Sequence, residues 1–419
     1  MRRASSPAKC NQRPTHGTRL LTTRFRQCVM SLITVCHPIH RWAVGGTERQ
    51  LATILRHLPA DRFRHIVLTR NGGVMPPLPS NVRSIDLARP QTDPRFADAL
   101  TEQLIAHRVD ILHLRGLSML LDGLVAAERA GDIAVVLGFH GFETAEDDLP
   151  ALRKPALGRA ALRCDARWAV SKSAARSIER SLRLPMGCFV AKPNGVDVHR
   201  FAPASDRAAI RARLGLTSDQ QIILCVGNYK PVKGQDVLLD AAAMLPAGWT
   251  KKTIFVFIGR DDLNGELQRR AAALSQPNFV ARFSTDCDDP LPWYQAADLF
   301  VLPSRWEGLS NALLEAMACE LPVIAAQIGG NVDAIEHERN GLLVPPDDAG
   351  ALVVAMKRLL TDPAKAGSMG RAARVRVTEC FEQQTAIARY AAGYEALARK
   401  VEARRCPARV ELLTRPRHG

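Results

Sequence analysis

Two glutamates stand eight positions apart in the stretch WEGLSNALLEAMACELPVIAAQIGG, which covers residues 306–330. Glu307 follows an apolar run that is typical of a strand, and Glu315 lies inside a run of good helix formers. Ser310 suits the N-cap of that helix, whose first N–H groups would be free to bind a phosphate. A carboxylate also accepts hydrogen bonds from the vicinal hydroxyls of a sugar. The pattern therefore predicts a ligand with phosphates at the helix start and hydroxyl groups on both sides.

Three other segments place a polar or flexible residue where an apolar run ends. Lys233 introduces the next helix after the run 221–227, and a lysine there can neutralise a diphosphate as it leaves. Gly45 and Gly46 separate a strand-like run from a helical one, so the backbone can approach a ligand closely. His140 ends an apolar run, where a lone histidine is either structural or part of a site.

Short apolar runs alternate with helical patterns along the chain, which is typical of parallel sheets covered on both faces. The expected strands are 32–37, 64–69, 82–87, 109–114, 133–140, 166–171, 221–227, 253–259, 278–283, 297–304, 321–326 and 341–346. The expected helices include 46–58, 235–245, 264–274, 310–319 and 350–361. The fold class is α/β, with two Rossmann-like, doubly wound domains that face a cleft. Such sheets bind ligands beyond the carboxyl ends of their strands.

The 419 residues exceed what one hydrophobic core usually supports, so two domains are expected. Residues 191–204 combine Pro and Asn-Gly with little periodicity and are the best linker. The expected parts are a disordered basic extension (1–30), a first Rossmann-like domain (31–195), a second Rossmann-like domain (196–375), a helical stretch that packs back on the first domain (376–402) and a basic tail (403–419).

The net charge of +15 is concentrated at the two ends of the chain. Residues 1–30 hold seven Lys or Arg and no acid, residues 403–419 hold five Arg and one Glu, and the rest carries only +4. Together with an aromatic content of only 5%, this argues against a nucleic-acid binder. The early arginines are not followed by the apolar run of a secretory signal peptide. A native start at Met30 is a simpler explanation of the extension.

Ten cysteines are scattered singly, which argues against a disulfide framework and against a zinc site. The scattered cysteines indicate a reducing, cytoplasmic protein, and no run approaches the roughly 18 apolar residues of a membrane span. The segment 152–163 is basic and amphipathic, and such a helix can lie on anionic lipid or simply on the protein surface. Peripheral contact with an anionic membrane is therefore a further expectation.

The thirty residues 306–335 resemble the E-x7-E signature of retaining glycosyltransferases of the GT-B fold, the family called glycosyltransferase group one. The resemblance implies that Glu315 binds the ribose of a nucleotide and that Glu307 contacts the transferred sugar. It also implies that backbone N–H groups of Gly308, Leu309, Ser310 and Asn311 bind the diphosphate.

The same resemblance extends to the other strand ends. It implies that the first domain is the acceptor domain and the second the nucleotide-sugar domain. It also implies that Lys233 grips the diphosphate and that Gly45 and Gly46 line the acceptor side of the cleft. His140 would lie near the acceptor and the reacting carbon, where it could bond to the sugar or help with the acceptor proton. Asn228 stands where the family pattern has an arginine, so the second charge of the phosphate clamp is missing or comes from another residue, such as Lys230 or Arg260. The segment 192–201 resembles the family's hinge.

The predicted function is transfer of a sugar from a nucleotide diphosphate sugar, with a UDP-linked donor favoured, to an acceptor hydroxyl in polysaccharide or glycolipid synthesis. The enzyme is expected to retain the anomeric configuration and to need no cofactor and no metal, because no Asp-x-Asp cation site follows a strand. A nucleotide-sugar epimerase or another enzyme on the same fold is the nearer alternative. A dinucleotide-dependent oxidoreductase is the more distant one, since the first strand–helix turn lacks G-x-G-x-x-G.

Overall fold

A computed structural model describes residues 32–42, 45–73, 76–89, 93–140, 153–250, 252–274 and 279–406. The predictions for residues 1–30 and for the end of the basic tail lie outside the described residues. Two sheets organise the rest of the chain, and every paired strand in both of them is parallel.

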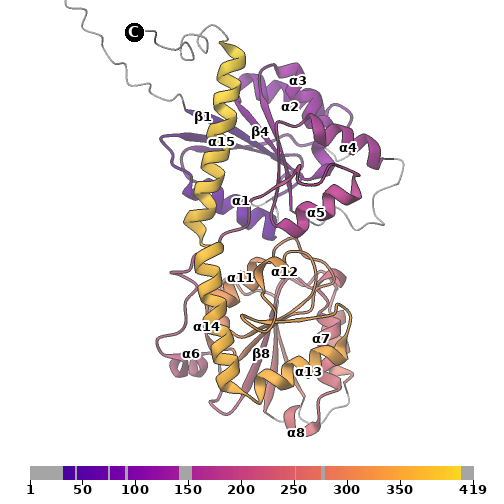
Figure 1. Ribbon diagram of the computed structural model, residues 1–419, viewed down its shortest axis with the longest axis vertical. Helices are drawn as coiled ribbons and strands as arrows, with labels where there is room; N and C mark the ends of the chain where they lie inside the picture. The colour runs from indigo at the N-terminus through magenta and orange to yellow at the C-terminus, as the bar shows by residue number, and fades with distance from the viewer. Residues whose placement is uncertain are drawn as a thin grey trace, which may run out of the picture. The chain divides into compact units, whose positions relative to one another are not determined.

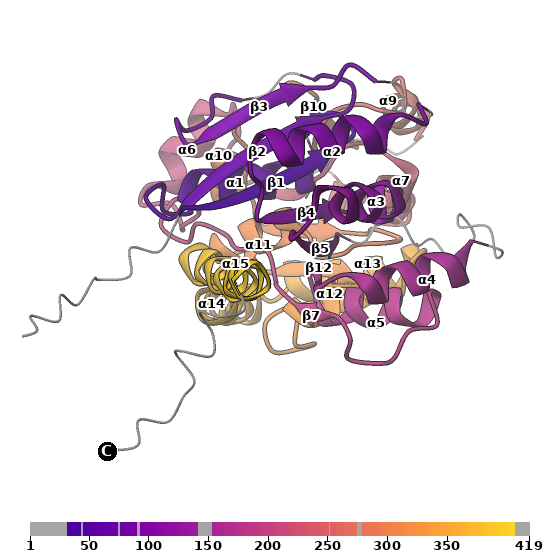
Figure 2. The same cartoon turned by 90° about the horizontal axis from the view of Figure 1, so that it is seen from above.

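The first sheet has seven strands and the order of a doubly wound fold. Its strands in spatial order are β3 (Val82–Asp86), β2 (Phe63–Thr69), β1 (Ile33–Ile39), β4 (Ile111–Arg115), β5 (Ala134–Phe139), β6 (Ala166–Ala169) and β7 (Val190–Ala191). The helices between them are α1 (Gly46–His57), α2 (Phe96–Ala106), a 3-10 turn η1 (Leu117–Met119), α3 (Leu120–Ala130), α4 (Lys154–Arg163) and α5 (Lys172–Ser181). Helices α2, α3 and α4 pack in a row, as Figure 2 shows.

The second sheet repeats the same order with six strands. They are β10 (Val280–Ser284), β9 (Thr253–Ile258), β8 (Gln221–Val226), β11 (Leu299–Leu302), β12 (Val323–Ala326) and β13 (Leu342–Val344). The connecting helices are α6 (Arg207–Arg213), a 3-10 turn η3 (Pro231–Lys233), α7 (Gln235–Ala243), α8 (Ala247–Thr250), α9 (Glu266–Ala272), α10 (Leu291–Ala296), α11 (Asn311–Ala318), α12 (Asn331–Ala334) and α13 (Ala349–Leu360). Both sheets therefore confirm the predicted α/β class.

The predicted strands all form, because continuous apolar runs suit positions that are buried on both faces. Strands β1, β5, β9, β11 and β12 are buried along their whole length. The short strand β7 ends at Ala191, the first residue of the segment that the sequence assigns to a linker. The boundaries between the predicted domains stay predictions, although the first sheet ends at Ala191 and the second begins at Gln221.

The C-terminal helical stretch is longer than predicted and consists of two helices, α14 (Pro363–Cys380) and α15 (Gln383–Arg405). Helix α14 packs on α11 and α13, whereas α15 packs on α1 and on strands β1, β4 and β5 (Figure 1). The break falls at Phe381 and Glu382, and the Glu382 side chain caps α15. Backbone hydrogen bonds join Val196 to Phe381 and Gln383, so the two segments that connect the first sheet with the second pair with each other here. Tyr390 and Tyr394 of α15 complete the core of the first sheet.

Candidate functional site

A cavity of about 690 Å³ lies at the carboxyl ends of the strands, where each sheet order reverses. Doubly wound sheets bind ligands at such switch points. Every residue that the sequence singles out for chemistry lines this space, which we call the strand-end cavity. These residues are Gly45, Gly46, His140, Asn228, Lys233, Glu307, Gly308, Leu309, Ser310, Asn311 and Glu315.

Glu307 and Lys233 form an ion pair inside the strand-end cavity. The Lys233 Nζ donates to Glu307 Oε1 at 2.7 Å, and the Ser304 hydroxyl donates to the same oxygen at 2.8 Å. Glu307 is only 3% exposed. Removing either partner would leave a largely buried charge unpaired, at a cost of about 3–5 kcal/mol. The pair therefore presents a fixed cation and a fixed carboxylate to a ligand.

Lys233 is positioned by a turn that packs against the end of β11. Gly234 has a φ of 63°, and a Cβ there would lie 2.1 Å from the Pro303 carbonyl oxygen, so the turn requires glycine. The Arg305 backbone N–H bonds to Val232 at 2.8 Å and fixes the two segments together. The lysine side chain is thus directed toward Glu307 by backbone contacts on both sides.

The loop 308–311 and the start of α11 form a second wall of the cavity. The Ser310 side chain accepts from the Leu313 N–H and caps the helix, as its sequence position predicts. A Cβ at Gly308 would lie 2.2 Å from the His140 carbonyl oxygen, so only glycine allows this close approach. Asn194 donates to the Leu309 carbonyl oxygen at 3.2 Å and to Asn311 Oδ1 at 2.8 Å. The loop is held in place by groups from both sheets.

Glu315 lies further along α11 and has a partner that the sequence analysis missed. The Tyr294 hydroxyl donates to Glu315 Oε2 at 2.9 Å. Burial raises the pKa of Glu315, and the bond from Tyr294 opposes that rise. One carboxylate oxygen is fixed by the tyrosine, which leaves Oε1 to face a ligand hydroxyl.

Asn228 does not stand alone at the opposite wall. Its Oδ1 accepts from the Arg260 backbone N–H at 3.3 Å. The two cations that could replace the family arginine share one carboxylate, since Arg260 contacts Asp262 at 2.7 Å and Lys230 contacts it at 3.5 Å. All but Asp262 line the strand-end cavity. Positive charge is therefore present near Asn228, although Asp262 neutralises part of it.

His140 lies at the end of β5, next to the arginine that ends β4. Arg115 and Gly138 are register partners in the two strands, which brings the two side chains together. Arg115 Nη1 lies 3.3 Å from His140 Nε2. Burial and the Arg115 charge lower the pKa of His140 to about 3. His140 is therefore a neutral imidazole at physiological pH.

The structure adds residues to the site that sequence reasoning placed elsewhere. Glu48 and Arg49 belong to the first turn of α1 and line the cavity, although they are not among the site residues that the sequence predicts. Burial raises the pKa of Glu48. Asn194 was interpreted as hinge architecture but holds the loop 308–311. Glu48 and Arg49 could have been found in the sequence because they follow Gly45 and Gly46 closely, and Asn194 because it lies in the hinge turn.

Two general properties bear on the chemistry. Among the described residues, no group of three or more His, Cys, Asp or Glu side chains is placed to hold a metal ion. In the part of the chain that the structure covers, no helix is both long and apolar enough to cross a membrane.

Comparison with known proteins places this geometry in a family. The family described as glycosyl transferases group 1 matches residues 206–376, and glycosyltransferase family 4 matches residues 44–200. A GDP-mannose-dependent alpha-(1-6)-phosphatidylinositol monomannoside mannosyltransferase of Mycolicibacterium smegmatis is 34% identical over 287 residues, which cover 66% of this chain and 73% of that protein. The chain belongs to the group 1 glycosyltransferases.

Other similar proteins agree with the group 1 assignment. A D-inositol 3-phosphate glycosyltransferase of Streptomyces avermitilis is 36% identical over 211 residues, or 48% of this chain and 45% of that protein. The structure of HepE from Anabaena in complex with UDP-glucose superposes with a TM-score of 0.74 at 21% identity, covering 87% of this chain and 100% of HepE. That likeness confirms the GT-B fold of this group 1 glycosyltransferase.

Proposed function

We propose that this glycosyltransferase moves a hexose from a nucleoside diphosphate sugar to an acceptor hydroxyl, with retention of the anomeric configuration and without a metal ion. The observation that carries the proposal is the buried Lys233–Glu307 pair beside the capped N-terminus of α11, within one cavity that also contains Glu315. A cation and free N–H groups suit a diphosphate, and the two carboxylates suit the hydroxyls of a ribose and of a hexose.

The roles follow from these positions. Glu315 Oε1 would accept from a ribose hydroxyl, while Tyr294 holds the other oxygen. The N–H groups of residues 308–311 and the Lys233 ammonium would neutralise the diphosphate as the glycosidic bond breaks, which is the charge that develops in the transition state. Glu307 would face the transferred sugar. This set of donors replaces the charge that a metal ion would supply, and it supports a metal-independent and cofactor-free reaction.

The nucleotide of the donor is either UDP, which the sequence analysis favours, or GDP. The mannosyltransferase from M. smegmatis supports GDP-mannose as the first donor to test, because it is 34% identical to this chain. The carboxylates of Asp286 and Asp288 line the cavity near Pro290. Guanine presents an N–H and an amino group that a carboxylate can accept from, whereas uracil presents a single N–H.

The donor proposal is tested with a panel of GDP-linked and UDP-linked sugars, with and without an acceptor such as phosphatidylinositol, inositol phosphate or a simple glycoside. Release of nucleoside diphosphate that depends on both donor and acceptor, with the α-anomer of the product from an α-linked donor, supports the proposal. Donor turnover to an isomeric nucleotide sugar without release of diphosphate would instead indicate an epimerase.

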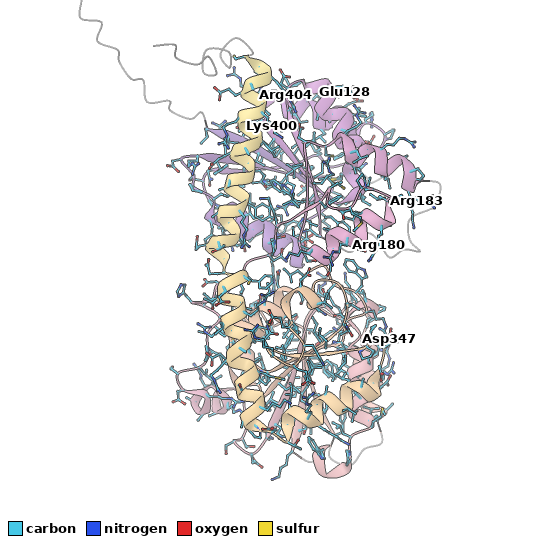
Figure 3. The ribbon with its side chains drawn as sticks, in the orientation of Figure 1. Glu128, Arg180, Arg183, Asp347, Lys400 and Arg404 are labelled. Atoms are coloured by element: carbon cyan, nitrogen blue, oxygen red, sulfur yellow. The ribbon has the colours of Figure 1, made fainter. Side chains whose placement is uncertain are left out.

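We also propose that a basic surface on α4 and α5 contacts an anionic membrane, which would give access to a lipid-linked acceptor from the cytoplasmic side. Both helices expose basic side chains. The carboxylate of Glu179 in α5 is buried and accepts a hydrogen bond from the Phe189 N–H, so it adds no negative charge to this surface. Leu162 and Met186 are 47% and 62% exposed beside them. Cations interleaved with exposed apolar side chains suit an anionic lipid surface. Figure 3 marks Arg180 and Arg183 on this surface.

Flotation with vesicles of phosphatidylcholine alone and with added phosphatidylglycerol tests the surface. Binding that needs the anionic lipid and is lost in the triple variant Arg176→Glu, Arg180→Glu, Arg183→Glu supports it. The double variant Arg399→Glu, Lys400→Glu on α15 reverses the charge of two other exposed side chains and should still bind. Equal flotation with both vesicle types would end the membrane proposal.

A further inference from the structure

Arg115 is a partly buried arginine at the end of strand β4. Within the described residues no carboxylate lies within ion-pair distance of its guanidinium, and Glu48 acts on it only from farther away. Its Nε and Nη2 atoms are buried, and no described residue offers them a hydrogen-bond partner. The groups around it on the interior side, His113 and Tyr394, carry no negative charge. A guanidinium in such a place lowers the stability of the fold, because its desolvation is not offset.

Among the described residues, the guanidinium makes one hydrogen bond, from Nη1 to His140 Nε2 at 3.3 Å, and His140 lines the strand-end cavity. An arginine side chain has five N–H donors and no acceptor. His140 Nε2 must therefore be the acceptor and carry no proton. A neutral imidazole has one protonated nitrogen, so the proton of His140 is on Nδ1.

We propose that Arg115 is a positioning residue that fixes His140 as a neutral hydrogen-bond donor, with Nδ1–H available to the sugar in the strand-end cavity. The inference rests on the proposed function and deepens it. It separates the two roles that the sequence left open for His140, because an imidazole whose basic nitrogen is occupied by a guanidinium cannot take the proton of the acceptor. The uncompensated charge of Arg115 lowers the stability of the fold, which is consistent with a functional reason for an arginine at this position.

Enzyme kinetics of the full chain give the first arm of the test. Arg115→Met removes the charge and keeps an apolar stem, so we expect kcat to fall about tenfold to a hundredfold, the usual range for a lost hydrogen bond to a charged group. His140→Gln should cause a similar fall. If Arg115 acts through His140, adding Arg115→Met to His140→Gln costs no further activity, since coupled residues are not additive. Arg115→Lys, which keeps a donor and a charge, should restore part of kcat.

Arg70 offers a matched control in the same sheet. It is also buried, at 4% exposure, but it lies 3.9 Å from the Asp122 carboxylate and its guanidinium stacks over the Phe96 ring at 4.1 Å. Arg70→Met should lower the melting temperature and leave kcat per folded molecule unchanged. Arg115→Met should show the reverse pattern, with an equal or higher melting temperature and a lower kcat.

Nitrogen NMR of the chain labelled with 15N-histidine gives the second arm and needs no substrate. The His140 signals are assigned by their loss in His140→Gln. We expect a proton on Nδ1 alone in the native chain and a mixture of both tautomers in Arg115→Met. A proton on Nε2 in the native chain overturns the inference, and so does an Arg115→Met variant that is less stable but equally active. If the native chain consumes no nucleotide sugar, the proposed function is refuted. The His140 tautomer measured by NMR still tests this inference, because that measurement needs no substrate.

Discussion

Acidification should destabilise this protein through three buried histidines in the strands of the first sheet. His37, His65 and His113 are 0%, 0% and 1% exposed, and they lie side by side on strands β1, β2 and β4. His37 Nε2 and His65 Nδ1 are 3.2 Å apart, and His113 Nδ1 lies 2.7 Å from the Tyr394 hydroxyl. Each ring has one further nitrogen for which the described part of the chain provides no hydrogen-bond partner. A proton added to any of them would create a buried charge.

The sign follows from where these groups bind protons. Burial lowers the pKa of His65 to about 3 and lowers the pKa values of His37 and His113 well below their usual range, with Arg115 adding to each shift. The unfolded chain binds protons near the ordinary histidine pKa of about 6.5, whereas the folded chain does not. Stability is therefore lost as the pH falls below about 6.5. Between pH 7.5 and 5.5, three such histidines lower the free energy of unfolding by about 3–4 kcal/mol in all.

Urea unfolding at pH 7.5, 6.5 and 5.5 measures this loss, with the free energy of unfolding taken from the transition at each pH. The variant His65→Asn should reduce the pH dependence by about a third. His199→Asn, which changes an exposed histidine, should leave it unchanged. The raised pKa values of Glu48 and Glu315 act in the opposite direction, so the difference between variants isolates the histidine contribution. An identical pH dependence in native chain and His65→Asn would refute the reasoning.

Four further outcomes are expected. Glu315→Ala should raise the donor Kd about tenfold or more, and Tyr294→Phe should raise it less, because the carboxylate then loses one hydrogen bond but stays in place; isothermal titration with the donor measures both values. Asn228→Arg should lower the donor Kd by restoring a charge near the diphosphate, and a weaker Kd would show that the arginine position is used differently. Turnover should persist in excess EDTA; its full loss, with recovery on adding a divalent cation, would contradict the metal-free proposal. Deletion of residues 1–29 should leave the melting temperature and kcat unchanged, which differential scanning fluorimetry and the release assay measure.

The fold was predictable because the chain has a simple periodicity. Apolar runs of strand length, separated by helical patterns, predicted the two parallel sheets and therefore the edge at which ligands bind. Local chemistry also predicted the Ser310 cap at the start of α11. The start of α14 was equally readable, because Asp362 and Pro363 form an N-cap and first-turn pair, yet the prediction began the helix at residue 376.

The contacts that orient the site side chains could not be predicted in the same way. Tyr294 meets Glu315 across 21 positions, and the Ser171 hydroxyl donates to the Gly308 carbonyl oxygen across 137. Arg115 meets His140 only because β4 and β5 are neighbours in a particular register. Sequence spacing places a residue at a strand end, whereas register and side-chain direction decide what it touches.

We propose that Lys233 and Glu307 act mainly during transfer of the sugar and contribute less to binding of the donor. The most direct test compares Lys233→Met and Glu307→Gln with the native chain for donor Kd by titration and for kcat by release of nucleoside diphosphate. We expect Kd to change by less than about tenfold while kcat falls about a hundredfold or more, because groups that stabilise charge in the transition state act mainly on kcat. A folded Glu307→Gln enzyme with native kcat would contradict it.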